Sequence, residues 1–217
     1  MRQTRVASDD FQIKVNEKGD TVMLVSYKTQ DVVNILNDDL SKLYKGTPFF
    51  KNGWYKGKIW NEQGRELSFV MAYNIERSEV YFSTGPMKEA INYKPNRFWL
   101  EGHTFELIYD KFYEPIYLGQ KGSLMKLYLC QLELKQPSQR IGYESSGSES
   151  EYEGVFVKSA KYYWRQGKKL CLFSNDKRTY RLFGDKRTEV QTYATARGLN
   201  LKNEQHLIEI FRYFDSL

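Results

Sequence analysis

The chain has 217 residues, of which 41% are hydrophobic and 16% aromatic, and its formal net charge is +6. This length suits one sizeable domain or two small ones, and the hydrophobic content excludes a chain that is disordered throughout. Because no run of about 18 apolar residues occurs, we expect no transmembrane helix. The positively charged segment 1–5 precedes no apolar stretch, so no signal peptide is expected.

The N-terminal region predicts a hairpin followed by a helix. The strand-like segments 11–15 and 21–27 flank the polar residues 16–20, as in a hairpin. Apolar residues between positions 32 and 44 then recur at spacings of one, three or four, with Thr29 as a candidate N-cap. Residues 46–48, Gly-Thr-Pro, would end that helix.

Residues 53–134 form the strand-rich core around which the rest of the chain is organised. The segment 53–60 is followed by a Gly-containing turn and by residues 65–75, in which Leu67, Phe69 and Met71 fall on one face. Such alternation is typical of a half-buried antiparallel strand, because successive side chains point to opposite faces. Further strands are predicted at residues 80–82, 97–100, 104–109, 116–118 and 124–134.

In the last of these strands the apolar face changes partway. Leu127 and Leu129 share one parity and Cys130 and Leu132 the other, which favours a β-bulge near Cys130 over burial of both faces.

Cys130 and Cys171 both lie in apolar strand-like contexts. Two buried thiols are the simpler interpretation, and a disulfide is the alternative that would suit an exported protein.

The C-terminal third predicts a loop, a hairpin and two helices. Residues 136–153 are rich in Ser, Gly and Glu, so we expect a flexible acidic loop. Strands at 155–164 and 169–174 follow, joined by a Gly-containing turn. A capping box at residues 188–191 predicts a helix that ends at Gly198, and Asn203 opens a second helix. Its apolar stripe, which should pack on the sheet, consists of Leu207, Ile208, Ile210, Phe211 and Phe214.

Together these elements predict a mainly β (α+β) fold in a single domain covering residues 1–217. It would combine the strand-rich core 53–134, the loop 136–153, and a hairpin with a C-terminal helical pair at 154–217. An open antiparallel sheet, a sandwich and a partly closed barrel all satisfy this pattern.

Several short motifs resemble a family of uncharacterised, mostly exported proteins of the Bacteroidetes group. They are residues 45–50 leading into 53–57, then Gly64, Tyr73-Asn74, 79–82, Tyr162-Tyr163 and the tail from 198–204 to Tyr213-Phe214. The resemblance covers about residues 45–217. It implies a β-rich exported domain, periplasmic or envelope-associated, with a helical tail. It implies no activity and carries over no functional residues.

No motif for catalysis, for a cofactor or for a metal ion stands out. His103 and His206 are the only histidines, and neither has a nucleophile or metal-ligand spacing beside it. We expect His103 in a turn next to Glu101, and His206 exposed in the first turn of the last helix. The protein is therefore expected not to be an enzyme and to need no cofactor.

The charge distribution provides the one candidate site. Residues 154–187 carry ten Lys or Arg and two Asp, a local charge of +8, with aromatic residues interleaved. Strand alternation alone produces such a mixture, with aromatics inward and Lys outward. Arg178, Arg181, Lys186 and Arg187 are the candidate anion- or partner-binding residues, because they precede the positive N-terminus of the predicted helix at Thr188.

Two functional hypotheses follow. The first is a non-enzymatic exported domain that binds an envelope protein or an anionic surface. The alternative is a cytoplasmic β-domain that binds single-stranded nucleic acid through residues 154–187 by stacking and phosphate contacts.

Overall fold

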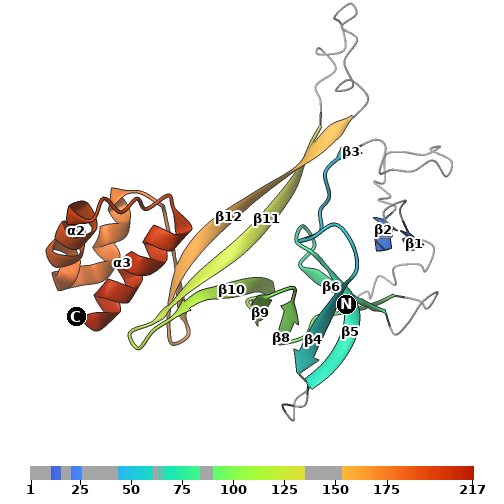
Figure 1. Cartoon of the computed structure of the whole chain (residues 1–217), viewed down its shortest axis with the longest axis horizontal. Helices are drawn as coiled ribbons and strands as arrows, with labels where there is room; N and C mark the ends of the chain where they lie inside the picture. Colours follow the sequence, from blue (N-terminus) through green and yellow to red (C-terminus); the bar gives the residue numbers. More distant parts are fainter. Residues whose placement is uncertain are drawn as a thin grey trace, which may run out of the picture. The chain divides into compact units, whose positions relative to one another are not determined.

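A computed structural model describes residues 11–15, 21–25, 44–60, 64, 66–83, 90–134 and 153–217 (Figure 1). The fold is mainly β, with a large, mostly antiparallel sheet that is not closed and helices at the C-terminal end. This confirms the predicted fold class and, of the possible sheet arrangements, selects an open sheet over a barrel.

The chain forms two compact units, each assembled from two separate stretches of sequence. The first unit comprises residues 1–102 and 130–158, and the second comprises 103–129 and 159–217. Two long strands, β11 (Ser123–Leu134) and β12 (Gly154–Gln166), therefore contribute residues to both units. The unit boundaries fall within or beside strands, and none coincides with the ends of the polar segment 136–153.

In the first unit the strand order is β8-β4-β5-β6-β7, and the neighbouring strands with a described register are antiparallel. A short strand, β3, pairs in parallel with the start of β12.

The predicted N-terminal strands are confirmed as an antiparallel pair, whereas the predicted turn at 16–20 and most of the predicted helix lie outside the described residues. The bounds are β1 Phe11–Val15, β2 Thr21–Val25, β3 Tyr44–Lys45, β4 Tyr55–Trp60, β5 Glu66–Asn74, β6 Glu79–Ser83, β7 Ile91–Tyr93 and β8 Arg97–Leu100.

The predicted alternation in β5 holds only in its first half. Leu67 and Phe69 are half-buried between exposed neighbours, but every residue from Met71 to Asn74 is buried. The second face is covered because Ala72 packs in a cluster with Phe49, Trp54 and Tyr81. Burial of both faces thus replaces the half-buried pattern where β5 enters the core.

In the second unit the order is β13-β12-β11-β10-β9, with β9 at His103–Ile108, β10 at Lys111–Leu118 and β13 at Lys169–Phe173. The register between β10 and β11 shifts between Pro115 and Tyr117, which leaves Ile116 as the extra residue of a bulge. The change of apolar face in β11, for which a bulge near Cys130 was predicted, lies at the point where β11 passes from the second unit to the first, and the bulge itself stays a prediction.

Three helical segments follow β13: the 3-10 helix η3 (Lys177–Lys186), α2 (Arg187–Ala196) and α3 (Glu204–Ser216). The capping box predicted at residues 188–191 is wrong, because η3 leads directly into α2. The N-cap of α2 is Lys186, which makes no side-chain cap hydrogen bond. The other two predictions are confirmed: Gly198, at φ 62°, follows the end of α2, and the Asn203 side chain accepts the N–H groups of Gln205 and His206.

The core of the second unit lies between its strands and α3. The Trp164 ring lies 4.7 Å from the Phe211 ring, and Phe173 and Phe183 pack on Phe211 as well. Figure 1 shows α2 and α3, in orange and red, beside the strands of this unit. The predicted stripe of α3 is buried except for Ile208, which is half-buried. The docking of the last helix on the sheet is therefore confirmed.

Candidate functional site

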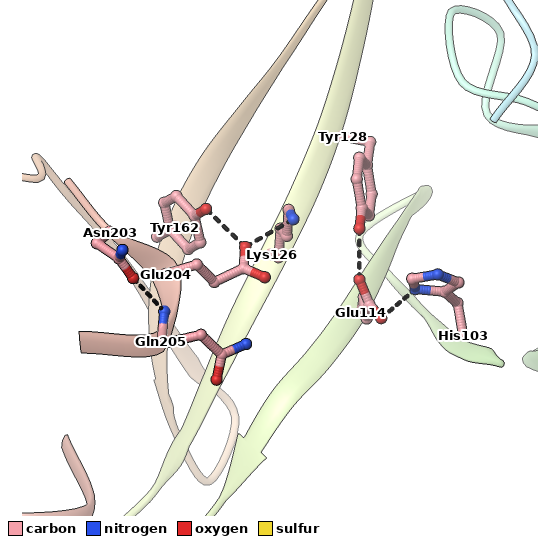
Figure 2. Close-up of polar contacts among 8 residues, drawn as sticks. All are labelled: His103, Glu114, Lys126, Tyr128, Tyr162, Asn203, Glu204 and Gln205. Carbon is pink, nitrogen blue, oxygen red and sulfur yellow. Dashed lines mark hydrogen bonds and ion pairs between the residues drawn. The ribbon is translucent and has the colours of Figure 1, made fainter. Parts of the chain in front are cut away.

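The second unit contains a cluster of polar side chains beneath the start of α3, which we call the polar cluster. Figure 2 shows its two halves, one around Glu114 and one around Glu204. The members come from four strands and one helix, which local sequence spacing does not reveal. They are His103, Glu114, Lys126, Tyr128, Tyr162 and Glu204.

The first half is centred on Glu114, whose side chain is 13% exposed. Its Oε2 accepts the Tyr128 hydroxyl at 2.6 Å, and its Oε1 lies 2.6 Å from Nδ1 of His103. Burial, and then the hydrogen bond to Glu114, raise the pKa of Tyr128 well above its ordinary value. The Tyr128 hydroxyl is therefore the donor in this contact, and Glu114 is the acceptor.

The second half is centred on Glu204, the first residue of α3. Its Oε2 lies 2.6 Å from Nζ of Lys126 on β11 and accepts the Tyr162 hydroxyl of β12 at 2.7 Å. Burial alone would raise the pKa of Glu204, but these two donors, with the charge of Lys126, outweigh it and lower that pKa. Lys126 also lies over the Tyr128 ring at 4.7 Å, which joins the two halves.

The other end of α3 is held by a second contact, the Asp215 clamp. The Asp215 carboxylate accepts the backbone N–H groups of Gln120 and Lys121 at 2.8 and 2.7 Å, and the Tyr117 hydroxyl at 3.2 Å. A Cβ atom on Gly119 would lie 2.6 Å from this carboxylate, so a larger residue there would force the Asp215 side chain to shift. The β10–β11 loop thus binds an anion, and that anion is a side chain of α3.

Glu204 of the polar cluster and the Asp215 clamp attach the two ends of α3 to the strands and to the β10–β11 loop. Their carboxylates accept hydrogen bonds from two or three donors each, as partly buried charged groups require. Such contacts are typical of a structural role, in which each carboxylate is engaged by donors of the same protein.

His206 lies in the first turn of α3, as predicted, but its exposure and the environment of His103 differ from the predictions. His103 is the first residue of β9, not a turn residue, and it contacts Glu114, whereas Glu101 pairs with Lys51 at 3.5 Å. His206 is half-buried instead of exposed, and its Nδ1 accepts the backbone N–H of Asn200 at 3.0 Å. Only the tertiary fold places a carboxylate eleven residues away against His103.

The four predicted anion-binding residues are all exposed on η3 and the start of α2. Two of them already have acidic neighbours: Arg178 forms a bidentate pair with Asp176, and Lys186 lies 3.0 Å from Glu189. Arg181 and Arg187 have no ion pair within the described residues.

A groove next to these residues was not predicted. It has a volume of about 420 Å³ and lies where η3, α2 and the α2–α3 connection meet. Lys177 and Lys202 line it and are exposed, with no acidic partner in the described part of the chain. Asp176, the acidic residue of the groove, is paired with Arg178. The remaining lining residues are Asn175, Tyr180, Gln191, Thr195, Leu199, Asn200 and Leu201.

The aromatic residues interleaved with the basic ones pack into the interior. Trp164, Phe173, Tyr180 and Phe183 are buried in one cluster with α3. Tyr162 donates to Glu204. The side chains on which bases would stack are therefore engaged in the fold.

Comparison of the chain with protein-family models, with curated proteins and with solved structures finds no match. Among the described residues, no group of three or more His, Cys, Asp or Glu side chains is placed to hold a metal ion. No helix in the described segments has the length and apolar character needed to cross a membrane.

Proposed function

We propose that this protein is a non-enzymatic binding domain of the cell envelope that holds an anionic partner at the helical end of its second unit. The supporting observation is a contrast between two sets of polar groups. The acid–base groups of the polar cluster are engaged with one another, and Glu204 attaches α3 through Lys126 and Tyr162. In contrast, two exposed lysines line the groove, and further exposed cations follow along η3 and the start of α2. The envelope location follows from the family resemblance, and cell fractionation tests it.

We call these exposed cations the basic end; its members are Lys177, Arg178, Arg181, Lys186, Arg187 and Lys202. Four of them, Lys177, Arg181, Arg187 and Lys202, form no ion pair within the described residues, so a ligand carboxylate or phosphate would not have to displace an acidic side chain there. Exposed cations of this kind contribute mainly long-range attraction, which is screened by salt.

The test is binding of a fluorescent decamer of glutamate by the full chain, followed by anisotropy. We expect the triple variant Lys177→Gln/Arg181→Gln/Arg187→Gln to bind about tenfold more weakly, the effect of losing roughly 0.5 kcal/mol for each of three exposed contacts. The matched control is Lys161→Gln/Lys168→Gln/Lys169→Gln, which removes three exposed charges on or beside β12 and β13.

Equal weakening by both triple variants would show that net charge alone drives binding, and would contradict a site at the basic end. A single-stranded dT20 probe tests the alternative function. Tighter binding of dT20 than of an equally charged glutamate peptide would favour the nucleic-acid reading over the one proposed.

A further inference from the structure

Strand β13 forms one edge of the sheet. In the described part of the chain its one neighbour is β12, with the register Tyr163↔Leu172 and Trp164↔Cys171. Leu172 on this edge is 56% exposed. An edge of this kind presents unpaired backbone groups and is open to pairing with another chain.

The register shows which backbone groups face outward. Gly167 and Lys168 form a two-residue turn, closed by the pair Gln166↔Lys169. In such a turn the closing residues are hydrogen-bonded to each other, and hydrogen-bonded pairs alternate with non-bonded ones along an antiparallel ladder. Cys171 therefore directs its N–H and C=O groups toward β12. Leu170 and Leu172 direct theirs away from it.

We propose that β13 pairs with β13 of a second copy of this chain, antiparallel and two-fold symmetric about Cys171. In this register the outward groups of Leu170 meet those of Leu172 of the second copy, so every outward N–H and C=O of the two leucines has a partner. Lys169 falls opposite Phe173 of the second copy. No two lysines face each other, and the exposed Leu172 is covered by another leucine.

The symmetry axis places the two Cys171 residues directly opposite each other as a non-hydrogen-bonded pair. Such pairs have Cα atoms about 4.5 Å apart, within the range of about 4.4–6.8 Å that a disulfide spans. Oxidised glutathione would then convert the two thiols to one disulfide and be reduced to two molecules of glutathione. A five-residue seam is short, so the association is weak until this bond forms.

The experiment oxidises the purified full chain with oxidised glutathione and measures the rate of dimer formation on non-reducing gels. We expect the wild type and Cys130→Ala to form the dimer at the same rate, and Cys171→Ala to form none. A dimer that persists in Cys171→Ala, or a wild type that stays monomeric, overturns the proposal. If the wild type stays monomeric, an extended segment of a different protein becomes the alternative partner of this edge.

The register is tested in a background that carries Cys130→Ala and Cys171→Ala. Adding Leu170→Cys and Leu172→Cys together should restore crosslinking, because each residue lies opposite the other in the second copy. Either substitution alone should crosslink at least fivefold more slowly. Equal rates for the single and double variants would contradict the two-fold register.

Leu172→Pro tests the backbone contribution, since it removes an outward N–H that β12 does not use, and proline is tolerated on edge strands. We expect the crosslinking rate through Cys171 to fall several-fold while the thermal unfolding midpoint is retained. If Leu172→Pro does not fold, the paired-cysteine variants still decide the question. A folded Leu172→Pro variant that crosslinks at the wild-type rate contradicts the pairing.

Discussion

At the scale of single residues, two carboxylates of α3 determine a feature of its packing that the apolar stripe of the helix does not determine. The stripe fixes which face of the helix is buried, but hydrophobic contacts are non-directional. Glu204 and Asp215 fix the position of the helix along the strands, because each requires donors at defined places on β11, on β12 or in the β10–β11 loop.

We predict that Asp215→Asn destabilises the protein at neutral pH by about 1 kcal/mol, the net contribution of a typical hydrogen bond. The N–H of Lys121, followed by those of other donors in the loop, lowers the pKa of Asp215. A carboxyl group with a lowered pKa stabilises the fold above its ordinary value near 3.8, and this stabilisation is lost as the pH falls through the lowered pKa.

Urea unfolding of the wild type and of Asp215→Asn between pH 3 and pH 8 measures this difference. It should be constant from pH 5 to pH 8 and shrink below about pH 4. The control is Asp185→Asn, which removes an exposed charge of η3 that has no ion pair among the described residues. A difference that does not depend on pH would show that the Asp215 clamp acts through shape and not through charge.

The sequence identified His103 as chemically interesting but could not identify its partner. Its contact, Glu114, is brought to it by the register of β9 and β10, in which Tyr113 lies opposite Glu106. That register depends on the turn at Tyr109 and Asp110, which have φ values of 47° and 67°. Neither residue is a glycine or an asparagine, so the usual sequence signal for such a turn is missing.

At the scale of elements, the two ends of α2 differ in how well the local sequence predicts them. Gly198 ends α2 in a Schellman motif, in which Leu199 N–H donates to Ala194 C=O at 2.9 Å and Gly198 N–H to Thr195 C=O at 3.1 Å. This motif is specified locally and was predictable. The start of α2 was not, because the preceding η3 supplies the turn that a capping side chain would otherwise stabilise.

This contrast gives a paired prediction. Asn203→Ala should destabilise the protein by about 1 kcal/mol, because it removes the side chain that accepts two N–H groups of α3. Thr188→Ala should change the stability by less than about 0.5 kcal/mol, since Thr188 is exposed within the first turn of α2 and is not its N-cap.

Thermal and urea unfolding of the two variants, side by side with the wild type, provide the measurement. Each variant serves as the control for the other, because both shorten one polar side chain near a helix start in the same unit. If Thr188→Ala lowers the free energy of unfolding as much as Asn203→Ala does, Thr188 caps α2 and the interpretation of its start is wrong.

At the scale of the whole molecule, the mainly β fold was predictable because alternation and turn residues are local signals. The division into two units was not, because it depends on which strands share a core. The sequence shows one polar interruption, at residues 136–153, whereas the units exchange segments at positions 102/103, 129/130 and 158/159.

We predict from this division that the helical end cannot fold alone. A fragment of residues 159–217 lacks Leu124, Lys126 and the β10–β11 loop, which pack against or bind α3. It should show no cooperative thermal transition by circular dichroism. A fragment of residues 103–217 retains the whole second unit and should keep one. A cooperative transition in the shorter fragment would contradict the discontinuous unit.

The discontinuity of the second unit also has a consequence during synthesis. Residues 103–129 are synthesised before the helices that cover them, and 87 further residues must be added before α3 is complete. At elongation rates of about 5–20 residues per second, the apolar side of β10 and β11 therefore stays uncovered by α3 for roughly 4 to 17 seconds. During that interval the nascent chain presents a surface that chaperones recognise, so its yield in cells should depend on them more than its size suggests.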